Sequence, residues 1–169
     1  MKRNELNKLI REVDRTGNNR NIAIIMLLVN TGVRLQELVS LNKEDIEMTE
    51  RKGQVTIRNG KGNKERVIPL NAEARRAIRR YLADRMDNES PLFLSTHGKR
   101  ISPRAVQHLL KKFGYNVHSL RHTFITTLVR NNEDFSLIQS LSGHSSTDMV
   151  TRYSLADNET KEIALEKLM

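Results

Sequence analysis

The stretch "RNIAIIMLLVNT", residues 20–31, is apolar on every side over most of its length. A helix with no polar face is buried all round, because none of its sides suits water. The segment is too short to cross a membrane, which takes about 20 apolar residues. It therefore predicts a buried central helix around which the rest of a globular domain packs.

Helices are expected on both sides of this segment. Upstream, apolar residues recur at i, i+3, i+4 and i+7 from Leu6 to Val13, which predicts an amphipathic helix over residues 4–15. Downstream, a break at Thr31-Gly32 precedes a short helix through "RLQELVSL". Further helices are predicted over residues 71–86, 102–113, 118–130 and 134–141, from about 146, and over 159–168.

One region changes to the period of two that is typical of strands. The runs "QVTIR" and "ERVIPL" flank "NGKGN", so residues 53–70 are predicted to form a β-hairpin. Residues 45–48, "DIEM", are a candidate third strand. The fold class is therefore mainly α with a small antiparallel β-sheet, and we expect a single domain over residues 1–169.

The composition narrows the function. The 29 Lys and Arg residues exceed the 20 Asp and Glu residues, giving a net charge of +9 that favours a polyanionic partner such as nucleic acid. The absence of cysteine excludes disulfides, thiolate zinc sites and cysteine nucleophiles. The N-terminus, "MKRNELNKL", lacks the apolar middle of a signal peptide. We expect a cytoplasmic protein with no membrane partner.

Two arginines stand where a phosphate could be held. Arg34 follows the Gly32 break at the start of a short helix, with Glu37 three residues later on the same face. Arg121 lies in "HSLRH", one helical turn after His118. Arginine suits a phosphodiester because its planar fork binds two oxygens and keeps its charge. Ordinary surface charge is the alternative for each residue taken alone.

Proton donors and acceptors are also available near these positions. His118 and Arg121 are expected to share one face of their helix, whose inner stripe is predicted as Leu120, Phe124, Thr127 and Leu128. The neighbouring His122 is a candidate to pack inward.

The hairpin supplies further cations. Lys61 stands at its tip between two glycines and can reach a substrate. Lys64 and Arg66 follow this tip, and we expect them to make contacts to the DNA backbone at most.

Three tyrosines are the candidate nucleophiles. Tyr81 lies on an apolar stripe and is predicted to be core, while spacing alone does not choose between Tyr115 and Tyr153. A metal-dependent nuclease would need clustered carboxylates, which the sequence does not offer.

Five motifs in order, "TGVRLQEL", "GKGNKERVIPL", "HSLRHTF", "LSGH" and "TRY", closely resemble the signature of the tyrosine recombinase family of phage integrases, Xer-type resolvases and mobile-element integrases. The match runs from about residue 6 to about residue 155. The resemblance implies the catalytic-domain fold of DNA breaking-rejoining enzymes, which acts on double-stranded DNA with no cofactor and no metal.

The resemblance also assigns the reacting groups. Tyr153 would be the nucleophile that leaves a 3′-phosphotyrosine and a free 5′-hydroxyl. Lys61 would be the general acid for the 5′-oxygen, and His118 the base toward Tyr153.

The remaining matched residues would surround the phosphate. Arg34 and Arg121 would clamp its non-bridging oxygens, and His144 would hydrogen-bond the phosphate or help to place the tyrosine. Glu37 matches the acidic residue that supports these groups in the family.

The resemblance carries expectations about assembly. The protein is expected to be a monomer alone and a tetramer on synapsed DNA, with residues 157–169 docking on a neighbouring subunit or on their own domain. The N-terminal DNA-clamping domain of the family is expected to be absent from this chain. Ser142 stands where leucine is usual in the family.

Two other functions remain as alternatives. The chain would be a catalytically silent DNA-binding regulator if catalysis had been lost, although the complete set of matched residues argues against this. A type IB topoisomerase-like enzyme would share the chemistry and relax supercoils. The hairpin motif and "LSGH" favour the recombinase.

Overall fold

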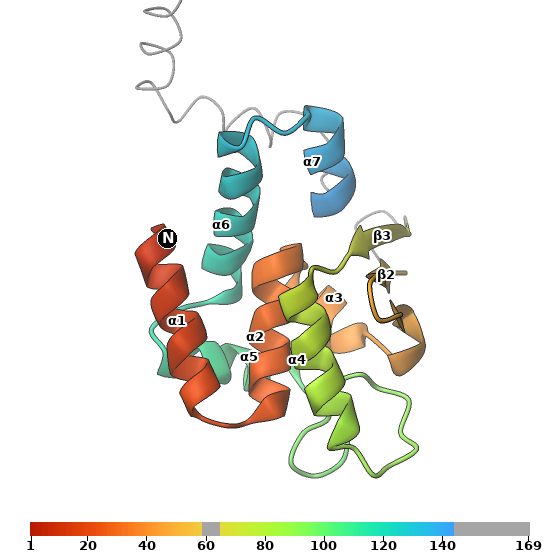
Figure 1. Cartoon of the computed structure of the whole chain (residues 1–169). Helices are drawn as coiled ribbons and strands as arrows, with labels where there is room; N and C mark the ends of the chain where they lie inside the picture. The colour runs from red at the N-terminus through yellow and green to blue at the C-terminus, as the bar shows by residue number, and fades with distance from the viewer. Residues whose placement is uncertain (59–64, 144–169) are drawn as a thin grey trace, which may run out of the picture.

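A computed structural model describes residues 1–58 and 65–143 (Figure 1). The helices predicted from about residue 146 and over residues 159–168 lie outside the described residues. The elements of the described part, in chain order, are α1 (Arg3–Arg15), α2 (Asn19–Thr31), α3 (Leu35–Ser40), the short 3-10 helix η1 (Lys43–Asp45), β1 (Ile46–Met48), β2 (Gly53–Ile57), β3 (Arg66–Pro69), α4 (Ala72–Ala83), α5 (Pro103–Lys112), α6 (Val117–Arg130) and α7 (Phe135–Ser142).

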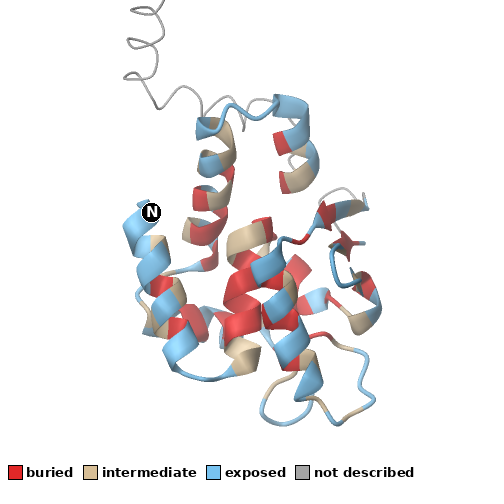
Figure 2. Ribbon diagram, in the orientation of Figure 1, coloured by how far each residue is buried: buried red, intermediate tan, exposed pale blue. Residues whose placement is uncertain are grey.

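The central helix predicted from the sequence is α2. It contacts α1, α4 and α6, and its Ile24, Ile25 and Leu27 are fully buried. The Asn18 side chain accepts a hydrogen bond from the Asn21 N–H and so caps the start of the helix. Figure 2 shows buried residues gathered on α2 and on the sides of the elements that face it. The main core is therefore organised around one helix.

The predicted hairpin and third strand form a three-stranded antiparallel sheet in the order β1-β2-β3. Val55 pairs with Ile46 on one side and with Ile68 on the other. Val55, Ile57 and Ile68 are buried and belong to the main core. The predicted fold class is confirmed by this arrangement.

Helix α4 buries the stripe that its sequence indicated. Its Tyr81 is a core residue, as predicted, because its ring stacks on that of Phe93 with centroids 5.6 Å apart. The Tyr81 hydroxyl accepts a hydrogen bond from the Leu94 N–H. Both the ring and the hydroxyl of Tyr81 therefore have structural partners in the core.

Helix α6 differs from its prediction in the face that it buries. Thr127, predicted to be inside, is exposed, and His122 is exposed instead of packing inward. The buried residues of α6 are Val117, Leu120, Arg121, Thr123 and Ile125. Leu120, Phe124 and Leu128 of the predicted stripe do pack inward, and the buried face also takes in Arg121, whose guanidinium meets the Gly32 and Ser142 carbonyls. Hydropathy alone would not place an arginine there.

The second half of α6 and α7 project from the main body (Figure 1). Their apolar contacts form a separate small cluster around Ile125 and Ile138, against which Phe124, Leu128 and Val129 pack. Helix α7 also contacts β3. Across residues 1–58 and 65–143, no helix combines the length and apolarity needed to cross a membrane.

Candidate active site

Three arginines from separate parts of the chain meet at the end of α7. They come from β3, from α6 and from the residue that precedes α3. Each donates to a different one of three consecutive carbonyls: Arg66 Nε to Leu141 O at 3.1 Å, Arg121 Nη2 to Ser142 O at 2.7 Å, and Arg34 Nη2 to Gly143 O at 2.9 Å. The last carbonyls of a helix lack partners within the helix and form the negative end of its dipole, so cations stabilise them.

Arg34 is held by Glu37. Its Nη1 atom donates to Glu37 Oε1 at 2.9 Å, and its backbone N–H donates to Glu37 Oε2 at 2.8 Å. The Glu37 carboxylate thus both caps the start of α3 and orients the Arg34 guanidinium. The Arg34 side chain is 27% exposed, which leaves it accessible to a substrate.

Arg121 is set by the break after α2. Its Nη1 atom donates to the Gly32 carbonyl, and Gly32 has a φ of 60°, which L side chains rarely adopt. A Cβ on Gly32 would lie 2.3 Å from Cδ1 of Phe124 on α6. Glycine here allows α6 to approach the end of α2 closely, and this approach brings Arg121 to the site.

Glu37 lies between Arg34 and Arg66 and is almost fully buried. Arg66 binds both of its carboxylate oxygens, at 2.9 and 2.7 Å. Burial alone would raise the pKa of Glu37, but the hydrogen bonds from Arg66 and from Arg34, together with the charge of Arg66, lower the pKa from 4.5 to about 2. The carboxylate therefore stays charged at neutral pH.

Arg66 is the residue that sequence reasoning misassigned. It was expected to reach the DNA backbone at most, but its side chain is only 10% exposed and is engaged with Glu37. A signal was present, because residues two apart in a strand share a face and Ile68 is plainly apolar. The same rule places Val67 outward, where it is 45% exposed.

The other predicted site residues divide into two groups. His118 lies in the first turn of α6 and is exposed, whereas Arg121 one turn later is buried. Lys61, His144 and Tyr153 lie outside the described residues, although His144 directly follows Gly143 in the sequence. The structure thus gathers Arg34, Glu37 and Arg121.

Tyr115, the alternative nucleophile, belongs to a different part of the molecule. Its hydroxyl donates to the Glu5 carbonyl of α1 at 3.4 Å. Within the residues that the structure describes, the Tyr115 and Tyr81 hydroxyls bond to the backbone of Glu5 and Leu94 and not to the three arginines.

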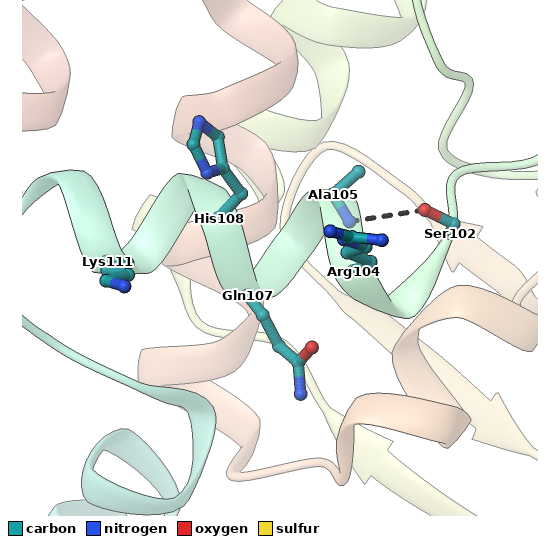
Figure 3. Close-up of a pocket in the computed structure, with 6 residues that line it drawn as sticks. All are labelled: Ser102, Arg104, Ala105, Gln107, His108 and Lys111. Atoms are coloured by element: carbon teal, nitrogen blue, oxygen red, sulfur yellow. Dashed lines mark hydrogen bonds between the residues drawn. The ribbon is translucent and has the colours of Figure 1, made fainter.

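A second feature is an open hollow of about 550 Å³ along the outer face of α5. Ser102 caps this helix by accepting a hydrogen bond from the Ala105 N–H (Figure 3). The hollow is lined by Ser102, Arg104, Ala105, Gln107, His108 and Lys111. Five of these six residues are polar or cationic, and α5 contacts α3. Within residues 1–58 and 65–143, no three His, Cys, Asp or Glu side chains form a group suited to a metal ion.

The model of the phage integrase family matches residues 1–160, and the chain belongs to this family. The tyrosine recombinase XerC of Thermodesulfovibrio yellowstonii is 36% identical over 155 residues, covering 82% of this chain and 50% of the relative. The tyrosine recombinase XerA of Pyrococcus horikoshii is 34% identical over 172 residues, covering 96% of this chain and 59% of the relative. The chain thus spans little more than half the length of these relatives.

Solved structures agree with this membership. A crystal structure of XerA recombinase has a TM-score of 0.82 at 27% identity and covers 99% of this chain and 62% of that chain. A XerH site-specific recombinase, bound to its palindromic difH substrate in a post-cleavage complex, has a TM-score of 0.81 at 25% identity, covering 98% of this chain and 52% of that chain. The family resemblance and fold class predicted from the sequence are confirmed.

Proposed function

We propose that this chain is the catalytic domain of a site-specific DNA recombinase that cuts and rejoins double-stranded DNA through a 3′-phosphotyrosine. The observation that carries the proposal is the convergence of Arg34 and Arg121 on adjacent carbonyls, directly before His144. Two guanidinium groups held at one place suit the extra negative charge that develops on a phosphate under attack.

The chemistry follows from the matched residues. The Tyr153 hydroxyl attacks phosphorus as His118 takes its proton, and Lys61 protonates the departing 5′-oxygen. Arg34 and Arg121 stabilise the two non-bridging oxygens in the transition state, and His144 donates a further hydrogen bond. A 5′-hydroxyl of another strand then attacks the phosphotyrosine and restores the free Tyr153 hydroxyl, so the bond energy is conserved throughout.

The DNA contact is proposed to extend to α5. Arg104 and Lys111 on its outer face suit phosphates, while Gln107 has the donor and acceptor pair that reads adenine in a major groove. Phosphate contacts make affinity fall steeply with salt. We expect Gln107→Ala to change sequence preference and Lys111→Ala to lower affinity for all sequences alike.

The test uses DNA duplexes of randomised sequence in the presence of EDTA. Each duplex carries a nick, so that the cut fragment diffuses away from the duplex. The full chain is expected to form an adduct that resists denaturation by detergent, and Tyr153→Phe to form none. An adduct in Tyr153→Phe would overturn the assignment of the nucleophile. DNA binding with no adduct in the parent protein would favour the silent regulator.

The assembly is part of the same proposal. The protein is expected to be a monomer alone and a tetramer on two synapsed sites, and sedimentation with and without DNA measures this. Exchange of strands between two labelled duplexes separates a recombinase from a topoisomerase-like enzyme, which would relax a supercoiled plasmid without exchanging partners.

A further inference from the structure

Arg66 has an unusual combination of burial and bonding for a residue next to a hairpin tip. Its side chain is 10% exposed, and its Nε, Nη1 and Nη2 atoms all make hydrogen bonds. Two of these bonds grip both oxygens of Glu37, a planar arrangement that fixes direction as well as distance. The third reaches the Leu141 carbonyl of α7.

Glu37 passes this constraint to Arg34. One carboxylate accepts from the guanidinium groups of both arginines, and its Oε1 atom is shared between Arg34 Nη1 and Arg66 Nη1, each at 2.9 Å. Any change in the direction of the Glu37 carboxylate therefore changes the direction of Arg34. Arg66 acts on the phosphate-binding guanidinium through one intermediate group.

Arg66 also constrains the point at which α7 ends. A Cβ on Gly143 would lie 2.7 Å from Arg66 Nη1, so the guanidinium lies directly against this glycine. Gly143 has a φ of 65° and donates its N–H to the Gln139 carbonyl to end the helix. Its own carbonyl accepts from Arg34 Nη2. Arg66 thus contacts the turn from which His144 continues.

Burial of such a network is costly for stability. Buried ion pairs are often no more stabilising than apolar side chains of the same volume, because desolvation of the charges offsets their attraction. Geometry is what the network supplies, since it joins β3, α3 and α7 through directional bonds. Other support at the end of α7 comes from the bond of Arg121 to Ser142, from Leu141 packed against the main core and from the small cluster around Ile125 and Ile138.

We propose that Arg66 is a positioning residue of the phosphate site: by joining Glu37 to the end of α7, it sets the orientation of Arg34 and of the turn at Gly143. The proposal rests on the proposed function for its catalytic consequence. It does not place Arg66 in contact with substrate.

The test compares Arg66→Lys with Arg58→Lys in the full chain. Lysine keeps the charge but loses the planar grip and the Nε bond. Arg58 is a matched control because it lies at the other side of the same hairpin and also binds a buried carboxylate, with Nε donating to Asp45 Oδ1 at 2.6 Å. The folded fraction of each variant is measured first, and rates are expressed per folded molecule.

The catalytic readout is the rate of adduct formation at saturating nicked DNA. Arg66→Lys is expected to lower it about tenfold to a hundredfold, because a misplacement of a positioning group by about 1 Å has effects of that size, while DNA affinity changes less than threefold. Arg58→Lys should stay within about threefold of the parent protein. If Arg66 acts through Arg34, Arg66→Lys should slow the reaction much less in the Arg34→Lys background than it does in the parent protein.

The structural readout is hydrogen exchange of the α7 amides, which needs no activity. Arg66→Lys is expected to speed exchange at Ser142 and Gly143 more than at α2, and Arg58→Lys to leave both unchanged. Equal effects of the two substitutions on rate and exchange, or additive effects with Arg34→Lys, would overturn the role of Arg66. Failure of the parent protein to form any Tyr153-dependent adduct would instead overturn the proposed function, and the exchange result would still decide whether Arg66 positions the turn.

Discussion

The carbonyl oxygen of Gly32 accepts a hydrogen bond from Nη1 of Arg121 across 89 residues of sequence. The glycine ends α2, and the arginine is buried in the second turn of α6. The left-handed turn at Gly32 leaves its carbonyl free of the helix, and the buried Arg121 guanidinium supplies the donor for this carbonyl. The site therefore depends on the geometry of the helix end as much as on the arginine itself.

Replacing Gly32 by alanine should be strongly destabilising. The positive φ costs about 1 kcal/mol or more for any L side chain, and the new Cβ would lie 2.3 Å from Phe124 Cδ1. With the overlap included, we expect a loss of about 3 kcal/mol in the free energy of unfolding, measured with urea. Gly17→Ala is the control, because Gly17 has a φ of 63° but nothing within 4 Å of its Cβ position. Equal losses in the two variants would show that contact with Phe124 does not matter.

Arg121→Met should separate catalysis from binding. The guanidinium is needed most in the transition state, so adduct formation should fall about a hundredfold to a thousandfold while DNA affinity changes little. The Gly32 and Ser142 carbonyls also lose a donor, so the variant should be less stable and its rate is corrected for the folded fraction. The loss of rate should persist after this correction. Arg130→Met, in the exposed last turn of α6, serves as the control and should keep the parent rate. Parallel losses of rate and affinity in Arg121→Met would contradict the clamp.

Glu37 should make stability depend on pH in acid. Its pKa is about 2 in the folded protein against 4.5 for an ordinary glutamate, so its contribution is complete above pH 4.5 and is lost as pH falls toward 2. The parent protein should lose on the order of 3 kcal/mol more over this window than Glu37→Gln does. Urea unfolding at several pH values measures the two slopes. The exposed Glu50→Gln should retain the parent slope, and an identical slope in Glu37→Gln would contradict the lowered pKa.

Two of the three tyrosines should be dispensable for DNA cleavage. Tyr115→Phe removes a hydroxyl that bonds to α1, and Tyr81→Phe removes the acceptor for the Leu94 N–H. Both variants should still form the covalent adduct, and Tyr81→Phe should lose about 1 kcal/mol in the free energy of unfolding because a partly buried N–H loses its partner. Mapping the DNA-linked peptide identifies the nucleophile directly. A linked peptide containing residue 115 would contradict the choice of Tyr153.

Elements that carry a local signal were predictable from the sequence. The α2 helix has an apolar run between the capping Asn18 and Gly32, and the hairpin has alternating residues around a glycine-rich turn. Arg34 and Arg121 were recognised through family motifs, and the structure brings them together. Glu37 was assigned to Arg34 by its spacing of three residues, which is a helical contact.

Arg66 shows what the sequence does not predict: strand alternation indicates its inward face, but not the partners that it meets there. Its partners, Glu37 and Leu141, lie 29 and 75 residues away, and nothing in the local pattern points to either. Hydropathy favours a basic residue at the surface, so neither Arg66 nor Arg121 is expected to be buried on hydropathy alone. In both cases the cost of burying an arginine is offset by acceptors that only the folded chain supplies.

The separate cluster around Ile125 and Ile138 gives the molecule two levels of resistance to unfolding. Helix α7 is held by arginine bonds at its end, by Leu141 against the main core and by the small cluster, whereas α2 is enclosed by aliphatic packing on most of its sides. Local opening follows the thinner packing first. We therefore expect α7 to open locally before the body around α2 does, so that the end of α7 adjusts while the central helix stays in place.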